Sequence, residues 1–122
     1  MAFLTDEALD GGLDYLTTNG SRIDICSSEP TTYAAATSTN TLGNKTGLSV
    51  GAAQAGDVNG RKVVVPAITD GSVSGTGTAT HWALTDGTGE LLATGALSAS
   101  QSVTSGNTFT LDAIDITIAD AT

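Results

Sequence analysis

Apolar and polar residues alternate along most of the chain after residue 20, and this alternation predicts β-strands. The clearest such segments are 22–26, 76–84 and 114–118, while 61–65 is a basic pair followed by three valines. A period of two directs one side of a strand into a core and the other into solvent. Turn signals separate the segments at regular spacing, for example Asp86-Gly87. The pattern predicts an all-β fold, a small β-sandwich or jelly roll of about eight strands.

Several connections follow from the same pattern. Residues 76–84 and 90–97 are expected to form one hairpin, and 101–104 and 108–111 another, around Ser105-Gly106-Asn107. Leu111 and Ile114 are out of phase for a single strand, so a bulge or kink is expected near Asp112-Ala113.

Other segments carry weaker signals. Pro66 ends the strand at 61–65 or places it at an edge. Asp70-Gly71 reads as a further turn. Between residues 31 and 60 we expect mostly loop, with short strands at 31–33 and 47–50.

One short helix is predicted at the start of the chain, within residues 1–20. Thr5 is a suitable cap, the acidic pair that follows it favours the positive end of the helix dipole, and Asn19-Gly20 is a natural stop. Leu4 before the cap and Leu9 inside the helix fit a hydrophobic staple. Gly11-Gly12 weakens the middle by roughly 1 kcal/mol per glycine, so this helix needs tertiary support.

The helix presents one apolar stripe, formed by Leu9, Leu13 and Leu16 at positions i, i+4 and i+7. Two interpretations remain open for it. In the first, the stripe covers one end of this chain's own sheet. In the second, it attaches to a neighbouring subunit.

Composition favours a single folded domain spanning residues 1–122, with a helical arm at 1–20 and a β-sandwich at 21–122. Hydrophobic residues make up 39% of the chain but aromatic residues only 4%, so the core is thin and would gain from burial against a partner. The net charge is −9 with only four basic residues. Nucleic acid and anionic membranes are therefore poor partners.

Candidate catalytic and metal-binding groups are few. His81 is the only histidine and Cys26 the only cysteine, so a zinc site lacks its ligands and a Cys–His pair has no local support. Asp86-Gly87-Thr88-Gly89-Glu90 resembles a calcium loop only faintly and is better explained as a turn. We expect no cofactor, no metal and no enzymatic activity. An enzyme would require an Asp/Glu cleft that the sequence does not reveal.

The start of the chain lacks the basic region and apolar run of a signal peptide, so synthesis in a host cytoplasm is expected.

The order of motifs along nearly the whole chain resembles a group of small structural proteins of tailed-phage virions. The motifs that carry the resemblance are Cys-Ser-x-x-Pro, Gly-Arg-x-Val-x-Val-Pro-Ala, His-Trp-Ala-Leu-x-Asp-Gly, Leu-Leu-Ala-x-Gly-Ala-Leu and Val-Thr-Ser-Gly-Asn-Thr-Phe, at residues 26–30, 60–67, 81–87, 91–97 and 103–109. They are structural in character, not catalytic. The resemblance therefore implies a place in the virion.

Within that setting the chain is similar to capsid cement, or decoration, proteins in size, β content and acidity. The resemblance implies location on the capsid surface, the major capsid protein as partner and a homo-oligomer, with a trimer favoured. The alternative is a tail-tip or fibre module that binds a host receptor or glycan through hydroxyl-rich loops and exposed aromatic residues.

For shell and subunit contacts we expect residues 1–18 and the loops between 31 and 60. The individual residues expected at the interface are Phe3, Leu4, Leu9, Leu13, Leu16 and Tyr33.

Overall fold

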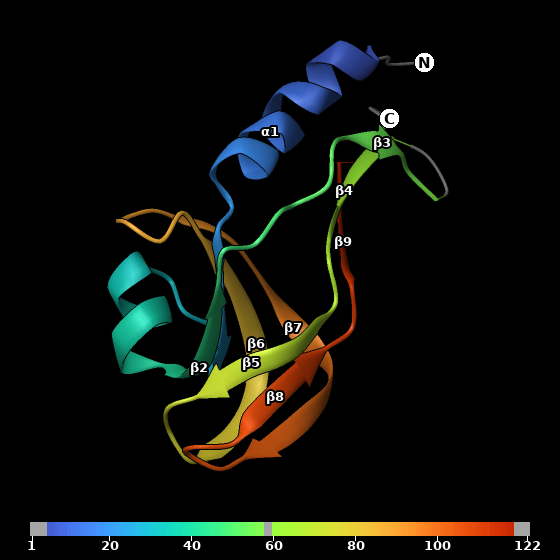
Figure 1. Cartoon of the computed structure of the whole chain (residues 1–122). Coiled ribbons are helices and arrows are strands. Elements are labelled where there is room, and N and C mark those ends of the chain that lie inside the picture. Colours follow the sequence, from blue (N-terminus) through green and yellow to red (C-terminus); the bar gives the residue numbers. More distant parts are fainter. Residues whose placement is uncertain (1–4, 58–59, 119–122) are drawn as a thin grey trace.

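The computed structural model describes residues 5–57 and 60–118, with one α-helix, one π-helix and nine strands in that part of the chain (Figure 1). Their bounds are α1 Asp6–Asn19, β1 Arg22–Cys26, η1 Ala35–Thr39, β2 Thr41–Thr46, β3 Gln54–Ala55, β4 Arg61–Val65, β5 Ile68–Val73, β6 Gly77–Thr85, β7 Leu91–Val103, β8 Thr108–Leu111 and β9 Ile114–Ile118. The predicted fold class is confirmed: a mostly β chain with two sheets and an N-terminal helix.

The larger sheet has six antiparallel strands in the order β7-β6-β1-β2-β5-β8 and curls into a half-barrel. The smaller sheet has three antiparallel strands in the order β3-β4-β9. The predicted hairpin across Asp86-Gly87 is present as β6 and β7, with Gly87 at a positive φ of 78° that glycine tolerates.

One two-stranded ribbon belongs to both sheets. β4 pairs with β9 in the small sheet, and their direct continuations β5 and β8 pair with each other in the large one. The chain bends between the sheets at Pro66-Ala67 on one strand and at Asp112-Ala113 on the other (Figure 1). The kink expected at Asp112-Ala113 is confirmed, and Pro66 ends β4 as expected because it has no N–H for a ladder.

The second expected hairpin is absent, because β8 pairs with β5 and not with β7. Phe109 lies opposite Gly71, where any side chain would collide with the phenyl ring. Asp70-Gly71 is accordingly a position inside β5 and not the predicted turn. β7 instead continues its pairing with β6 as far as Val103.

The segment between residues 31 and 60 also differs from expectation. It contains η1, β2 and the two-residue strand β3, whereas the strands expected at 31–33 and 47–50 do not form. β2 exists because it pairs along its whole length with β1. Such long-range pairing outweighs a weak local pattern.

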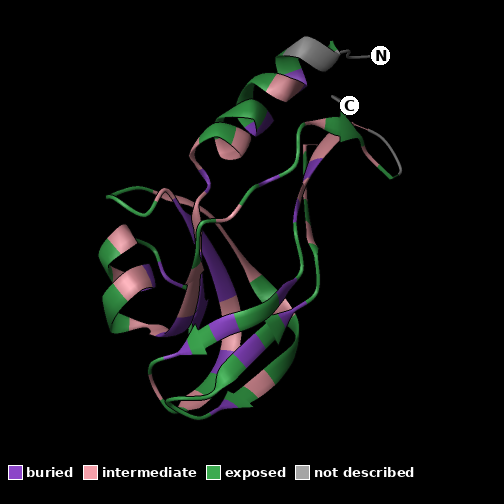
Figure 2. Ribbon diagram, viewed as in Figure 1, coloured by how far each residue is buried: buried purple, intermediate pink, exposed green. Residues whose placement is uncertain are grey.

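The main core combines buried aliphatic and aromatic residues of the curled sheet with Leu13 of α1, Val50, and Val63 and Val65 of β4. Figure 2 colours these buried positions along the ribbon. Ala79 and Trp82 both belong to this core, so the alternation expected along 76–84 changes phase between them. The cause is a register shift at Thr80, which sets Ala79 opposite Gln101 but His81 opposite Ala96.

Helix α1 begins after Thr5, whose Oγ1 accepts a hydrogen bond from the amide of Ala8 at 3.2 Å. It packs against β4 and β9, and Arg61 bonds Asp10 of the helix at 2.8 Å. None of the helices in residues 5–57 and 60–118 has the length and apolar character needed to cross a bilayer.

Candidate functional site

The stripe on α1 is used largely within the chain. Leu9 and Leu13 are only 2% and 1% exposed, and Leu13 belongs to the main core. Within this chain these two side chains are packed inside the fold and are not exposed, while the interface expected from the sequence stays a prediction. The apolar face of the helix packs against β4 and β9 of this chain's own small sheet.

The other expected interface residues are placed differently. Leu16 and Tyr33 are half-buried. Phe3 and Leu4 lie outside the described residues.

An apolar groove of about 450 Å³ runs between α1, the start of β7 and β9. Five of its large apolar side chains are half-buried, and they are Leu16, Leu91, Leu92, Ile116 and Ile118. Of the others, Leu13 is buried and Tyr15 is exposed. One sequence signal could have revealed it. Leu91 and Leu92 are consecutive, so a β-strand must direct one of them away from the core.

The groove has a polar, acidic bridge. Tyr15 of α1 donates a hydrogen bond to Glu90 beside β7, at 2.5 Å between the oxygens. This bond, together with the negative charge of Glu90, raises the pKa of Tyr15. Tyr15 is 51% exposed and is the large apolar residue most open to solvent in the described chain.

Every basic residue of the chain is occupied by an acidic partner. Arg22 bonds Asp24, Lys45 bonds Asp70, Arg61 bonds Asp10, and Lys62 bonds both Asp57 and Asp115, at nitrogen–oxygen distances of 2.7 to 3.1 Å. Other acids, such as Asp14, Glu90 and Asp112, have no basic partner among the described residues. The surface therefore combines neutralised cations with uncompensated carboxylates.

Cys26 and His81 are brought together as direct partners on β1 and β6, which the sequence alone did not support. The thiol is fully buried, and its desolvation raises the pKa to about 12. His81 Nδ1 lies 2.9 Å from Oγ1 of Thr80, not against the sulfur. A protonated, buried thiol is a poor nucleophile, so we interpret Cys26 as a packing residue beside Ala36 and Ala83.

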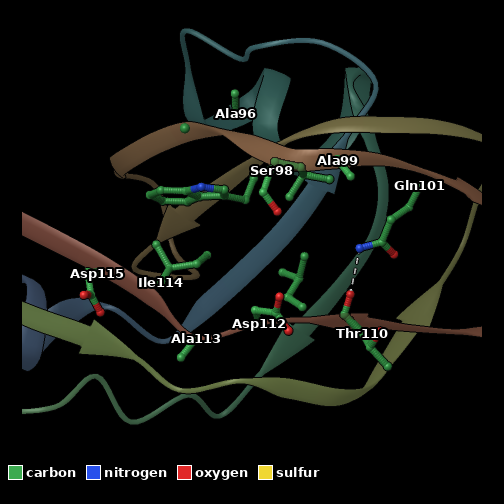
Figure 3. A pocket seen from close by; sticks show the side chains of 13 residues that line it. Ala96, Ser98, Ala99, Gln101, Thr110, Asp112, Ala113, Ile114 and Asp115 are labelled. Atoms are coloured by element: carbon green, nitrogen blue, oxygen red, sulfur yellow. Dashed lines mark hydrogen bonds between the residues drawn. The ribbon is translucent and has the colours of Figure 1, made fainter.

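A second cavity, of about 570 Å³, opens where β7 and β8 fail to pair (Figure 3). One wall is the β7 segment from Gly95 to Gln101, and the opposite wall runs from Thr110 through the Asp112-Ala113 kink to Asp115. Trp82 of β6 also lines it. The side chain of Gln101 closes one end by donating to the carbonyl oxygen of Thr110 at 2.9 Å.

This cavity depends on a bulge in β7. Ala96 pairs with His81 and Gln101 with Ala79, so four residues of β7 lie opposite the single Thr80. Beside this bulge β7 pairs with β6 alone and not with β8. Sequence reasoning missed the site because it assumed that these two strands form a hairpin, and no local pattern signals the bulge.

No family model, curated protein or solved structure was found to match the chain. Within the described residues, no group of three or more His, Cys, Asp or Glu side chains is placed to hold a metal ion.

Proposed function

We propose that this chain is a structural protein of a tailed-phage virion that decorates and stabilises the capsid shell. The observation that carries the proposal is the apolar groove between α1, β7 and β9, in a small β-module whose motifs resemble virion structural proteins. In this proposal the groove receives a segment of the major capsid protein.

The groove suits an apolar segment because its walls are aliphatic and only partly covered. Leu16, Ile116 and Ile118 each retain solvent contact while packing on the main core. Covering such surface stabilises a complex by about 25 cal/mol per Å² before the costs of association. A chain with so few aromatic residues gains proportionally more from this added burial.

Charge restricts the partner further. The chain carries a net charge of −9, its four cations are held in internal ion pairs, and Glu90 lies in the groove wall. An apolar segment flanked by Lys or Arg complements this surface, whereas an acidic segment is repelled. Binding should accordingly weaken as ionic strength rises.

Stabilisation of the shell would follow from mass action. A protein that binds the assembled shell, and not the free subunit, shifts the equilibrium toward assembly. Many copies on one particle add their contributions even where each contact is weak. A trimeric assembly of this chain, as the resemblance implies, would increase that effect. Light scattering of the purified protein measures its oligomeric state.

The docking surface is tested with matched substitutions on one strand. Ile116→Thr combined with Ile118→Thr removes apolar groups from the groove, while Ile114→Thr on the same strand is half-buried but lines the other cavity. We expect the double variant to lose at least tenfold in affinity for shells stripped of this protein, measured by co-sedimentation, and the control to keep most of it. Equal binding by the wild type, the double variant and the Ile114→Thr control contradicts the docking surface.

Placement in the particle is tested separately. Purified virions are divided into heads and tails, and the copy number in each fraction is measured by quantitative mass spectrometry. Hundreds of copies on heads are expected. A few copies confined to tails would favour the tail-tip alternative, and absence from both fractions would contradict a virion role.

A further inference from the structure

We propose that the cavity between β7 and the β8–β9 kink binds a neutral saccharide. This site goes beyond capsid docking and uses different residues. Its volume of about 570 Å³ falls within the range of roughly 300 to 1,000 Å³ that is common for small-molecule sites.

The first support is an available donor. Within the described chain, every side-chain nitrogen or oxygen that is sealed from solvent has a hydrogen-bond partner. The indole N–H of Trp82 makes no hydrogen bond to the described residues. Because no solvent-inaccessible polar atom lacks a partner, this N–H is accessible to solvent, although Trp82 as a whole is only 8% exposed. Because Trp82 lines the cavity, a ligand there can accept this hydrogen bond.

The second support is an available acceptor on the opposite wall. Asp112 lies in the kink between β8 and β9 and has no basic partner in the described chain, unlike Asp115, which bonds Lys62. Ser98 lies across from it on the β7 bulge (Figure 3). A hydroxyl group is both donor and acceptor, so a polyhydroxylated ring can use the N–H and the carboxylate together.

The third support is the apolar part of the lining. Trp82, Leu97, Leu111 and Ile114 surround these polar groups. A pyranose ring has the matching character, since it carries C–H faces as well as hydroxyl groups. A purely apolar ligand would leave the polar groups unpaired, which is unfavourable for each buried group.

The charge of the cavity defines the class of sugar. The carboxylate of Asp112 is uncompensated, so a sialic or uronic acid would meet a like charge. Neutral hexoses and N-acetylhexosamines avoid this repulsion. On a particle with many copies, even weak sites of this kind would add up to useful adhesion to a glycan-coated surface.

The test uses the only tryptophan of the chain as reporter. Trp82 emission of the full protein is titrated with glucose, galactose, N-acetylglucosamine and their β-linked disaccharides, with N-acetylneuraminic acid as the charged comparison. We expect a saturable change with at least one neutral sugar, at millimolar concentration, and none with the acid. Absence of a saturable response to all of the neutral sugars overturns the proposal.

Two variants locate the binding. Asp112→Asn should weaken it at least tenfold, since hydrogen bonds to charged groups are the stronger ones. The control Asp14→Asn changes a carboxylate that is also exposed, on α1, and should leave the affinity unaltered. Ser98→Tyr partly fills the cavity from an exposed position whose side chain points inward (Figure 3), and it should abolish the response while the circular dichroism spectrum stays native. Unchanged affinity in Asp112→Asn or in Ser98→Tyr contradicts the site.

The failure of this proposal is distinct from failure of capsid docking. The Ile116→Thr, Ile118→Thr protein should bind sugar normally, because neither residue lines this cavity.

Discussion

The indole of Trp82 lies against the backbone of Gly95, its direct partner on the neighbouring strand. A Cβ atom on Gly95 would be 2.7 Å from each of three indole atoms, including the ring nitrogen. An aromatic side chain that covers a cross-strand glycine fixes both the strand register and its own position. Here it also fixes one wall of the cavity beside β7.

Gly95→Ala should therefore displace the indole. We expect a loss of about 1–3 kcal/mol in the free energy of unfolding, the usual cost of overpacking, together with a shift in the emission of Trp82. Urea unfolding followed by fluorescence measures both. Gly89→Ala is the control, because nothing lies within 4 Å of a Cβ there. Equal stability of the two variants would contradict the close packing of Trp82.

The buried carboxylate of Asp24 should be the most sensitive polar group of the fold. It is 0% exposed and accepts two hydrogen bonds from Arg22, at 2.8 and 2.9 Å, and one from Thr41 at 2.7 Å. Arg22→Met leaves this charge without a cation, and we expect the free energy of unfolding to fall by about 3 kcal/mol. In thermal unfolding, Lys45→Met should cost less than about 1 kcal/mol, because its pair with Asp70 is exposed.

The turn between β6 and β7 should make stability pH-dependent. Asp86 accepts hydrogen bonds from the amides of Thr88, Gly89 and Glu90, which lower its pKa from 3.8 to about 2. A pKa depressed on folding adds stability above the unfolded value, and this is lost as the pH falls through the folded value. Wild type should therefore exceed Asp86→Asn in Tm at pH 5, and the difference should shrink toward pH 2. A constant difference would contradict the role of the charge.

The thiol of Cys26 should be inert in the folded protein. Burial raises its pKa to about 12, so very little thiolate exists at pH 8. We expect negligible reaction with a disulfide reagent until the protein is unfolded. A Cys26→Ser, Ser28→Cys double variant places the thiol at an exposed position two residues away and should react at once. Rapid reaction of wild type would contradict the burial of Cys26.

Local sequence signals predicted the elements that rest on local interactions. The cap at Thr5, the end of α1 before Gly20, the turn at Asp86-Gly87 and the kink at Asp112-Ala113 all depend on neighbouring residues. Such features follow from backbone preferences that a short segment already contains. The fold class followed in turn from the alternation that these turns separate.

Strand pairing could not be predicted in the same way. A turn sequence at residues 104–107 is compatible with a hairpin, yet β8 pairs with β5, and Phe109 packs over Gly71 where a side chain would collide with the ring. The bulge in β7 and the cavity beside it depend on that choice. The burial of Leu13 likewise depends on where β4 and β9 lie, which no pattern within α1 encodes.

The ribbon shared by the two sheets sets an order of events during synthesis. Residues 61–73 pair with residues 108–118, so β4 lacks β9 and β5 lacks β8 until residues 108–118 have left the ribosome. The β1–β2 and β6–β7 pairs join segments much closer in sequence and can form earlier. Both sheets are therefore completed together, once residues 108–118 have been made. A ribosome-bound chain ending before residue 108 should leave the valines of β4 open to protease or chaperone.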